Sequence, residues 1–290
     1  MDSPYNFLAG HGICAVEPVF SIDDIEKWNQ VVDPILASQD LARRYVNAQQ
    51  LFENGLLYAI FNKKMRSLIA HLLPVSVLYH CHIYEIDGNQ SKSHIRTGDG
   101  LLGWHRDEEC LPYYVPGKPN TISIFIYLTD VGTDSGPFEI ANYPPQKFWN
   151  RIGGKPCYKM VGGRSYTFIF DRTYIHRAHP NSDPIKRRVL KLSIQPPSIE
   201  NKRIGLPEYV KVLQEIKGKD IFLEHLFGGE CDQKKYAEIV AMYKKFPHPN
   251  SLHLEENSSI KIGPLHELEV RLTSRLRKIY KVIKGETNGY

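Results

Sequence analysis

Two histidine motifs lie far apart in the sequence and limit how the chain can fold. The motif GWHRDEE at 103–109 contains His105 and Asp107, and YIHRAHPNSDPIKRR at 174–188 contains His176. Side chains at positions i and i+2 of a β-strand point to the same side. His105 and Asp107 can therefore reach one ion, and a third ligand must come from another strand. The motifs favour a fold that brings distant strands together.

The chemistry of these residues points to a metal. Two imidazoles and one carboxylate form the facial triad of non-haem Fe(II) oxygenases, which leaves the opposite face of the ion open. We therefore predict that His105, Asp107 and His176 bind one Fe(II). A His-x-Asp pair alone is a weak signal, because it also arises by chance. A histidine on an apolar strand is also often a hydrogen-bonded core residue. The prediction is favoured by the strand-like segments beside both motifs and the basic pair after the second.

Strand patterns fill the middle of the chain. The clearest, at 120–130, has aliphatic side chains on one face and polar and aromatic side chains on the other. Further strands are expected at 12–19, 77–86, 162–170 and 188–194, with helices starting at Ser21 and spanning 62–73. Many short strands with helices only before and after them predict a mainly β fold with flanking helices. The expected core is a double-stranded β-helix, the jelly-roll or cupin-like arrangement.

The pattern changes after Pro197. Helices are expected at 207–216, 220–227, 233–246 and 265–284. We therefore expect a β-helix domain with N-terminal helices at 1–197 and a helical extension packed on the core at 198–290.

The helix expected at 265–284 has a leucine and isoleucine stripe and basic residues on its other faces. A membrane-surface or nucleic-acid role is conceivable for it. Packing on the core is favoured, and the stripe could also form a homodimer contact.

Composition narrows the functional classes. The 290 residues carry a net charge of +5, which does not demand nucleic acid but suits an anionic substrate. The five scattered cysteines, without a Cys-x-x-Cys pair, indicate reduced thiols and a cytoplasmic location. The start of the chain has no signal-peptide pattern, and no stretch of about 20 apolar residues predicts a membrane span.

Four stretches in order resemble one known family. They are GICAVEPVFSIDDIEKWNQVVD at 12–33, WHRD at 104–107, FIYLTDVGTDSGPF at 125–138 and the second histidine motif at 176–190. Together they resemble the phytanoyl-CoA dioxygenase family of Fe(II)- and 2-oxoglutarate-dependent oxygenases, over residues 5–197. The resemblance implies Fe(II), 2-oxoglutarate as co-substrate and O2. It also implies release of succinate and CO2 as a substrate C–H bond is oxidised.

The resemblance also assigns residues to the co-substrate. Arg187, eleven positions after His176, matches the arginine that pairs with the distal carboxylate of 2-oxoglutarate, and Phe125 and His82 match positions beside it. Structural packing is an alternative for Phe125 and His82. Where many relatives have Gly-Ser after the distal histidine, this chain has Arg177-Ala178. A halogenase is disfavoured because Asp107 is present.

Three functions are open from the sequence. The first is hydroxylation, or another oxidation, of a small molecule, with specialised metabolism as the expected setting. The second is the same chemistry on a larger lipid- or sugar-linked substrate. The third is a non-catalytic jelly-roll binding protein, against which the complete triad and Arg187 argue.

Overall fold

The computed structural model describes residues 4–41, 43–90, 104–141, 155–254 and 256–262. The strands are β1 Ile13–Val16, β2 Arg43–Val46, β3 Val77–Ile86, β4 Ile122–Tyr127, β5 Phe138–Ala141, β6 Lys155–Met160, β7 Thr167–Asp171, β8 His176–Ala178, β9 Arg187–Gln195, β10 Ser251–Leu252 and β11 Glu256–Ile262. The helices are α1 Pro4–His11, α2 Ile22–Ala37, α3 Ala48–Glu53, α4 Leu56–Ile60, α5 Lys63–Leu72, the 3₁₀ helix η1 Glu108–Tyr113, α6 Pro207–Ile216, α7 Ile221–Leu226 and α8 Gln233–Lys244.

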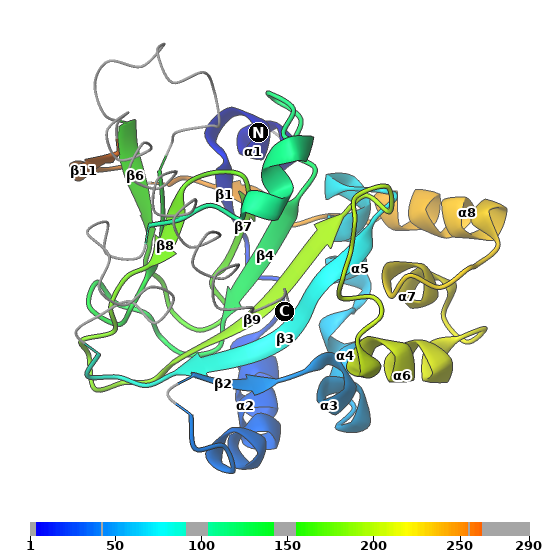
Figure 1. Cartoon of the computed structure of the whole chain (residues 1–290), viewed down its shortest axis with the longest axis horizontal. Coiled ribbons are helices and arrows are strands. Elements are labelled where there is room, and N and C mark those ends of the chain that lie inside the picture. Colours follow the sequence, from blue (N-terminus) through cyan, green and yellow to red (C-terminus); the bar gives the residue numbers. More distant parts are fainter. Residues whose placement is uncertain (1–3, 42, 91–103, 142–154, 255, 263–290) are drawn as a thin grey trace, which may run out of the picture.

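The strands form two antiparallel sheets. The larger has seven strands in the order β10-β1-β7-β4-β9-β3-β2, and the smaller has four in the order β11-β6-β5-β8. Figure 1 places α5 to α8 on one side of the long strands β3, β4 and β9, with β6 and β8 on the other side. The expected mainly β jelly-roll core with flanking helices is confirmed. Within the described ranges both sheets stay open, and no closed barrel is formed.

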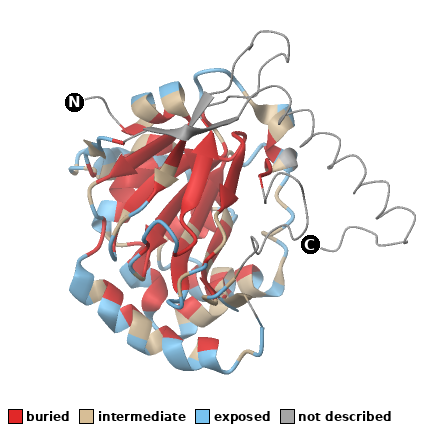
Figure 2. Cartoon of the chain, turned by 90° about the vertical axis from the view of Figure 1, so that its left-hand side faces the viewer, coloured by how far each residue is buried: buried red, intermediate tan, exposed pale blue. Residues whose placement is uncertain are grey.

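The two faces of the larger sheet differ in chemistry because side chains alternate along each strand. On β4, Ile122, Ile124 and Ile126 join the core shared with the helices, whereas Phe125 and Tyr127 belong to a second, more aromatic core. The strands are almost wholly buried, and exposed residues gather on the outer faces of the helices (Figure 2). The polar and aromatic face of β4, which was expected to line the interior, therefore does line it.

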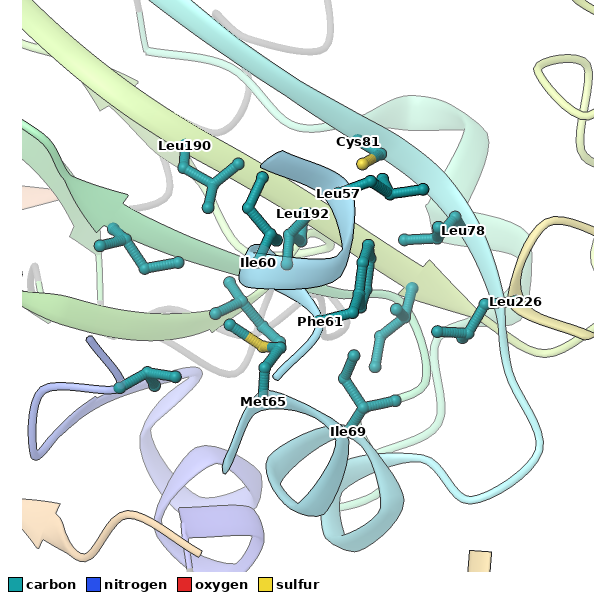
Figure 3. Packing of buried hydrophobic residues seen from close by; sticks show 14 of the residues in the cluster. Leu57, Ile60, Phe61, Met65, Ile69, Leu78, Cys81, Leu190, Leu192 and Leu226 are labelled. Carbon is teal, nitrogen blue, oxygen red and sulfur yellow. The ribbon is translucent and has the colours of Figure 1, made fainter. Parts of the chain in front are cut away.

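The helix-facing core is packed with large aliphatic side chains. Leu190 and Leu192 of β9 lie against Ile60 and Phe61 at the end of α4 and Met65 of α5 (Figure 3). Helix α2 begins where the sequence offers a cap: the Ser21 hydroxyl accepts a hydrogen bond from the Asp24 amide, 3.1 Å away. These contacts fix the larger sheet on one side and leave its other face for the site.

One tyrosine ties the two sheets together. The Tyr127 hydroxyl of β4 donates to the carbonyl oxygen of Met160 on β6 at 2.9 Å. The same hydroxyl accepts from the Phe138 amide of β5 at 3.1 Å. A buried hydroxyl with both a donor and an acceptor partner holds the sheets at a fixed spacing.

The segment after residue 197 is built into this body. Helices α6 to α8 supply side chains to the helix-facing core, and β10 and β11 extend the larger and smaller sheets. The sequence predicted helices here but not these strands. The helix expected at 265–284, with its possible dimer contact, lies outside the described residues, and the boundary at residue 197 stays a prediction.

Two further findings concern composition-based expectations. All five cysteines are free thiols, four of them buried, as expected from their spacing. Of the helices in the described ranges, none combines the length and apolar character needed to cross a membrane.

An ion pair between α5 and the start of α7 tests whether the extension unfolds with the core. Arg66 donates to both oxygens of Asp220 at 2.9 and 2.6 Å, and both side chains are largely buried. Asp220→Asn keeps an N-cap acceptor but removes the charge. We expect it to lower the free energy of unfolding by about 2–3 kcal/mol, somewhat below the cost of breaking a fully buried pair. Urea unfolding measures this.

Glu200→Gln is the matched control, because Glu200 is exposed and its ion pair with Lys202 is long, at 4.0 Å. It should change the unfolding free energy by less than about 0.5 kcal/mol. A separate early transition in Asp220→Asn, with the main transition unmoved, would contradict a single cooperative unit.

Candidate metal centre

Backbone pairing brings the two histidine motifs together. The His105 amide donates to the His176 carbonyl at 2.9 Å, and the His176 amide donates to the His105 carbonyl at 2.8 Å. His176 opens β8, but His105 makes only an isolated bridge beside it. Asp107 is extended, with φ −76° and ψ 93°, directly before η1. The expected strand at His105 is therefore a single bridge, but the extended backbone still presents both side chains to one point.

The side chains of these residues form a cluster that can hold a metal ion. Their candidate ligand atoms all lie within 4.8 Å of one another. His176 Nε2 lies 4.0 Å from Asp107 Oδ1, too far for a hydrogen bond, and the two imidazole rings are 4.4 Å apart. His179, the other histidine of the second motif, is not part of the cluster. Among the described residues this is the one such group of three.

A backbone carbonyl sets the tautomer of His176. Its Nδ1 lies 2.9 Å from the Tyr174 carbonyl oxygen, which can only accept a hydrogen bond. The Nδ1–H tautomer therefore donates there and leaves the Nε2 lone pair directed at the cluster. Burial lowers the pKa of His176 although the charge of Asp107 opposes this, so the imidazole is held in its neutral, metal-binding form.

A buried arginine orients the carboxylate. Arg172 Nε donates to Asp107 Oδ2 at 2.8 Å, and another guanidinium nitrogen donates to Glu109 Oε1 at 2.6 Å. Burial raises the pKa of Asp107, but Arg172 and, to a smaller extent, His176, Lys191 and His105 together outweigh it, and the pKa falls well below its usual range. Asp107 is therefore an ionised ligand at neutral pH. The sequence analysis missed Arg172, whose only signal is a cation in the bend before His176.

The cluster opens into a cavity between the two sheets. Its volume of about 50 Å³ is several times the roughly 10–15 Å³ that one water needs. Phe125 and Phe170 of the larger sheet and Phe138 of the smaller one form an aromatic wall. Phe125 thus lines the cavity, and its position beside 2-oxoglutarate stays a prediction. The remaining lining residues are the three cluster members, Ala178, Tyr84, Arg43 and Lys191.

Arg187 does not line the cavity but contacts Tyr84, which does. It is 1% exposed, and it donates to the Gly136 carbonyl and, at 3.2 Å, to the Tyr84 hydroxyl. Its Nε has no hydrogen-bond partner, and no described carboxylate lies within ion-pair distance of the guanidinium. Tyr84 itself lines the cavity. Arg187 is therefore a buried cation with spare donor capacity next to the cavity.

Arg188 points the other way, as alternation along β9 predicts. Its guanidinium pairs with Glu85 and with Asp33, at 2.5 and 2.7 Å, and donates to Asn29 at 2.8 Å. These partners belong to β3 and α2, on the helix side of the sheet. Arg188 is therefore fully compensated by the protein, in contrast to Arg187.

The turn before β5 places the carbonyl that Arg187 contacts. Gly136 has φ +71°, and a Cβ there would lie 3.1 Å from the His179 carbonyl oxygen and 3.0 Å from the Asn181 side chain. Only glycine fits this left-handed, crowded position. The Gly-Pro pair seen in the sequence is thus a structural requirement of the site.

Other predicted positions lie less close to the cavity. His82 is not among the lining residues; Tyr84, two positions along β3, lines it instead, and His82 lies across from Lys191 on β9. Ala178 lines the cavity where many family members have serine, and Arg177 points away to pair with Glu139. No hydroxyl is therefore supplied from that position.

Comparisons with known proteins identify the fold. No family model and no curated protein matches the sequence. SnoN, titled an epimerase of nogalamycin biosynthesis in complex with Fe3+, alpha ketoglutarate (2-oxoglutarate) and nogalamycin RO, is 13% identical. It aligns over 74% of this chain and 91% of its own with a TM-score of 0.51. The chain has the fold of the non-haem iron, 2-oxoglutarate-dependent enzymes.

Two further solved structures support this. The carbocyclase SnoK is 13% identical, with a TM-score of 0.52 over 67% of this chain and 83% of its own. EctD from S. alaskensis, with 2-oxoglutarate and 5-hydroxyectoine, is 15% identical. Its TM-score is 0.51 over 69% of this chain and 79% of its own. These neighbours agree with the family resemblance found in the sequence. At such identities they establish the fold.

Arg172 offers a test of the metal centre. In Arg172→Met, burial is no longer opposed by the guanidinium, so the pKa of Asp107 rises and a metal must displace a proton. We expect Fe(II) affinity to fall about 10–100-fold, with a larger loss at about pH 6 than at about pH 8 because ligand protonation competes with the metal. Anaerobic calorimetry at both pH values measures this.

Arg164→Met is the matched control, because Arg164 is exposed and pairs with Glu26 and Asp130, neither of which belongs to the cluster. It should bind Fe(II) like the parent protein. Asp107→Ala should bind no iron tightly. Full iron content in Asp107→Ala would rule out the cluster as the metal site.

Proposed function

We propose that this protein is an Fe(II)- and 2-oxoglutarate-dependent oxygenase that hydroxylates a C–H bond of a small molecule. The observation that carries the proposal is that a possible metal site and a buried arginine lie close to the same cavity. His105, Asp107 and His176 converge there as a two-imidazole, one-carboxylate set. Arg187, a buried arginine without a described acidic partner, contacts Tyr84, which lines the same cavity.

The metal site fits Fe(II) by its donor set. Two neutral nitrogens and one carboxylate on a single side leave the remaining positions for 2-oxoglutarate and O2. Bound there, Fe(II) would supply oxidative decarboxylation of 2-oxoglutarate to succinate and CO2, coupled to oxidation of the substrate. Arg172 keeps Asp107 ionised and oriented, and the Tyr174 carbonyl fixes the ring of His176. The aromatic wall keeps bulk water away from the reacting centre.

Arg187 is the residue best suited to the distal carboxylate of 2-oxoglutarate. Its charge cannot be neutralised at working pH, and a buried cation without an anionic partner is costly. A carboxylate can accept two hydrogen bonds from one guanidinium. The Tyr84 hydroxyl, already bonded to Arg187, can donate its proton to the same carboxylate. Phe125 would pack beside the carbon chain of the co-substrate.

The type of substrate follows from the cavity and the neighbours. A small, aromatic-walled cavity favours a small molecule over a lipid- or sugar-linked one. The solved neighbours include an epimerase and a carbocyclase of nogalamycin biosynthesis, so specialised metabolism is a reasonable setting. Hydroxylation is our proposal among these outcomes, and product mass distinguishes it: a gain of one oxygen, against none for epimerisation. Five free thiols support a reducing, cytoplasmic location.

The adjacent arginines of β9 allow a matched test of co-substrate binding. Arg187→Ala should raise the Km for 2-oxoglutarate at least tenfold, because truncating one partner of a buried charge pair costs about 2–5 kcal/mol. Iron affinity should stay near that of the parent. Arg188→Ala should destabilise the fold because it removes one cation from the buried Glu85, which keeps its pair with Arg44, but it should change the Km for 2-oxoglutarate less than about twofold. Succinate release measures both.

The assignment fails if Arg188 is the sensitive position, or if neither substitution alters dependence on 2-oxoglutarate. A metabolite library screened for substrate-dependent succinate release, with Asp107→Ala as the inactive control, would test the proposed activity. If the parent protein released no more succinate than Asp107→Ala with any compound, the result would count against an oxygenase.

A further inference from the structure

Two more cations line the cavity and have no place in the proposed chemistry. Arg43 comes from the edge strand β2, and Lys191 comes from β9. Within the described part of the chain, no carboxylate lies within ion-pair distance of either, whereas Arg44 and Arg188 on the opposite face of the same strands are paired. The Nε of Arg43 is buried without a hydrogen-bond partner.

Aromatic rings hold both cations in place. The Arg43 guanidinium lies over Tyr84 and Tyr45, 4.5 and 4.9 Å from the ring centroids. The Lys191 ammonium lies 5.6 Å from the Phe125 centroid. Cation–π contacts orient a charge without neutralising it. Both groups therefore keep their capacity to bind an anion.

The position of Lys191 separates it from the predicted 2-oxoglutarate contact. Lys191 is four residues after Arg187 on the same face of β9, which is about 13 Å along an extended strand. Lys191 pairs in register with Phe125, next to the metal cluster, whereas Arg187 pairs with Ile86 at the other end. The five-carbon chain of 2-oxoglutarate is shorter than two extended residues, about 7 Å. The distal carboxylate held by Arg187 therefore lies far from Lys191, and the charge of the carboxylate at the metal cluster would be offset by Fe(II). Lys191 is thus left for another ligand.

Charge balance leads to the same conclusion. The two positive charges of Fe(II) would be offset by Asp107 and by the carboxylate of 2-oxoglutarate that lies at the metal, which leaves the distal carboxylate. Arg187 would offset the rest, and Arg172 is offset by Glu109. Arg43 and Lys191 remain uncompensated. Burial lowers the pKa of Lys191 to about 7, against the charge of Asp107, which raises it, and the nearby arginines add to the lowering. With the charge of Asp107 taken up by Fe(II), a bound anion would relieve an unfavourable arrangement.

We propose that Arg43 and Lys191 form a second anion subsite, which binds a carboxylate or phosphate group of the substrate. The substrate class is then a small anionic molecule, whose oxyanion is held next to Phe125 so that a neighbouring C–H bond faces the metal cluster. This inference rests on the proposed oxygenase function. The net positive charge of the chain suits such a ligand.

The test uses the full chain loaded anaerobically with Fe(II) and saturating 2-oxoglutarate. Phenyl phosphate, benzoate and the neutral benzamide are titrated by calorimetry. We expect one or both anions to bind and benzamide not to bind, and the tighter anion identifies the oxyanion class. Lys191→Met and Arg43→Met should each weaken that binding at least tenfold. Lys202→Met and Arg164→Met, which alter exposed cations, should not change it.

Two readouts separate this inference from the proposed function. The charge-transfer absorption of the Fe(II)–2-oxoglutarate chelate reports the loaded site, and it should be retained in both variants with 2-oxoglutarate affinity within about threefold of the parent. The melting temperature should change little, because each substitution removes a desolvated charge without an ion-pair partner together with its weak cation–π contacts. Lys191→Gln serves as a second variant.

Equal binding of benzamide and the anions overturns the subsite, as does anion binding that survives both substitutions. A loss of 2-oxoglutarate affinity in Lys191→Met without a loss of anion binding would assign Lys191 to the co-substrate and also overturn it. Absence of the chelate absorption in the parent protein would instead contradict the proposed function.

Discussion

The alternation of side chains along β9 is the constraint on which the rest of the structure depends. Leu190 and Leu192 face the helices and anchor the larger sheet to them, whereas Arg187 and Lys191 face the interior. A slip of one residue would bury charges under the helices and place leucines in the cavity. The β3–β9–β4 ladder therefore fixes the core and the chemistry of the cavity at once.

The interior is costly for the fold. Arg187, Lys191 and Arg43 are partly or fully desolvated and have no described acidic partner, while the cations of the opposite face are paired. Charges that the protein leaves uncompensated are stabilised only when a ligand supplies the opposite sign. In our proposal, 2-oxoglutarate and an anionic substrate do this. The free energy of unfolding is then lower without these ligands and rises when they bind.

The proposed iron ligands depend on neighbours that do not touch the ion. The Tyr174 carbonyl sets the tautomer of His176, and Arg172 holds Asp107 ionised against the effect of burial. Both supports come from the bend that precedes β8. The bend therefore positions two ligands that are far apart in the sequence. Such outer contacts decide how tightly a metal is held.

The sequence by itself determined the period-two strands, the two histidine motifs and the direction of Arg187 against Arg188, because alternation and residue chemistry are local properties. It gave no sign of short strands such as β2 and β10, whose stability comes from partners elsewhere in the sheets. Nor did it reveal Arg172 as the partner of Asp107, or Arg43 beside Lys191. Those pairings join residues distant in the chain. The strand order of the larger sheet brings Arg43 near Lys191, and the packing of the two sheets, with the desolvation it imposes, brings Arg172 to Asp107.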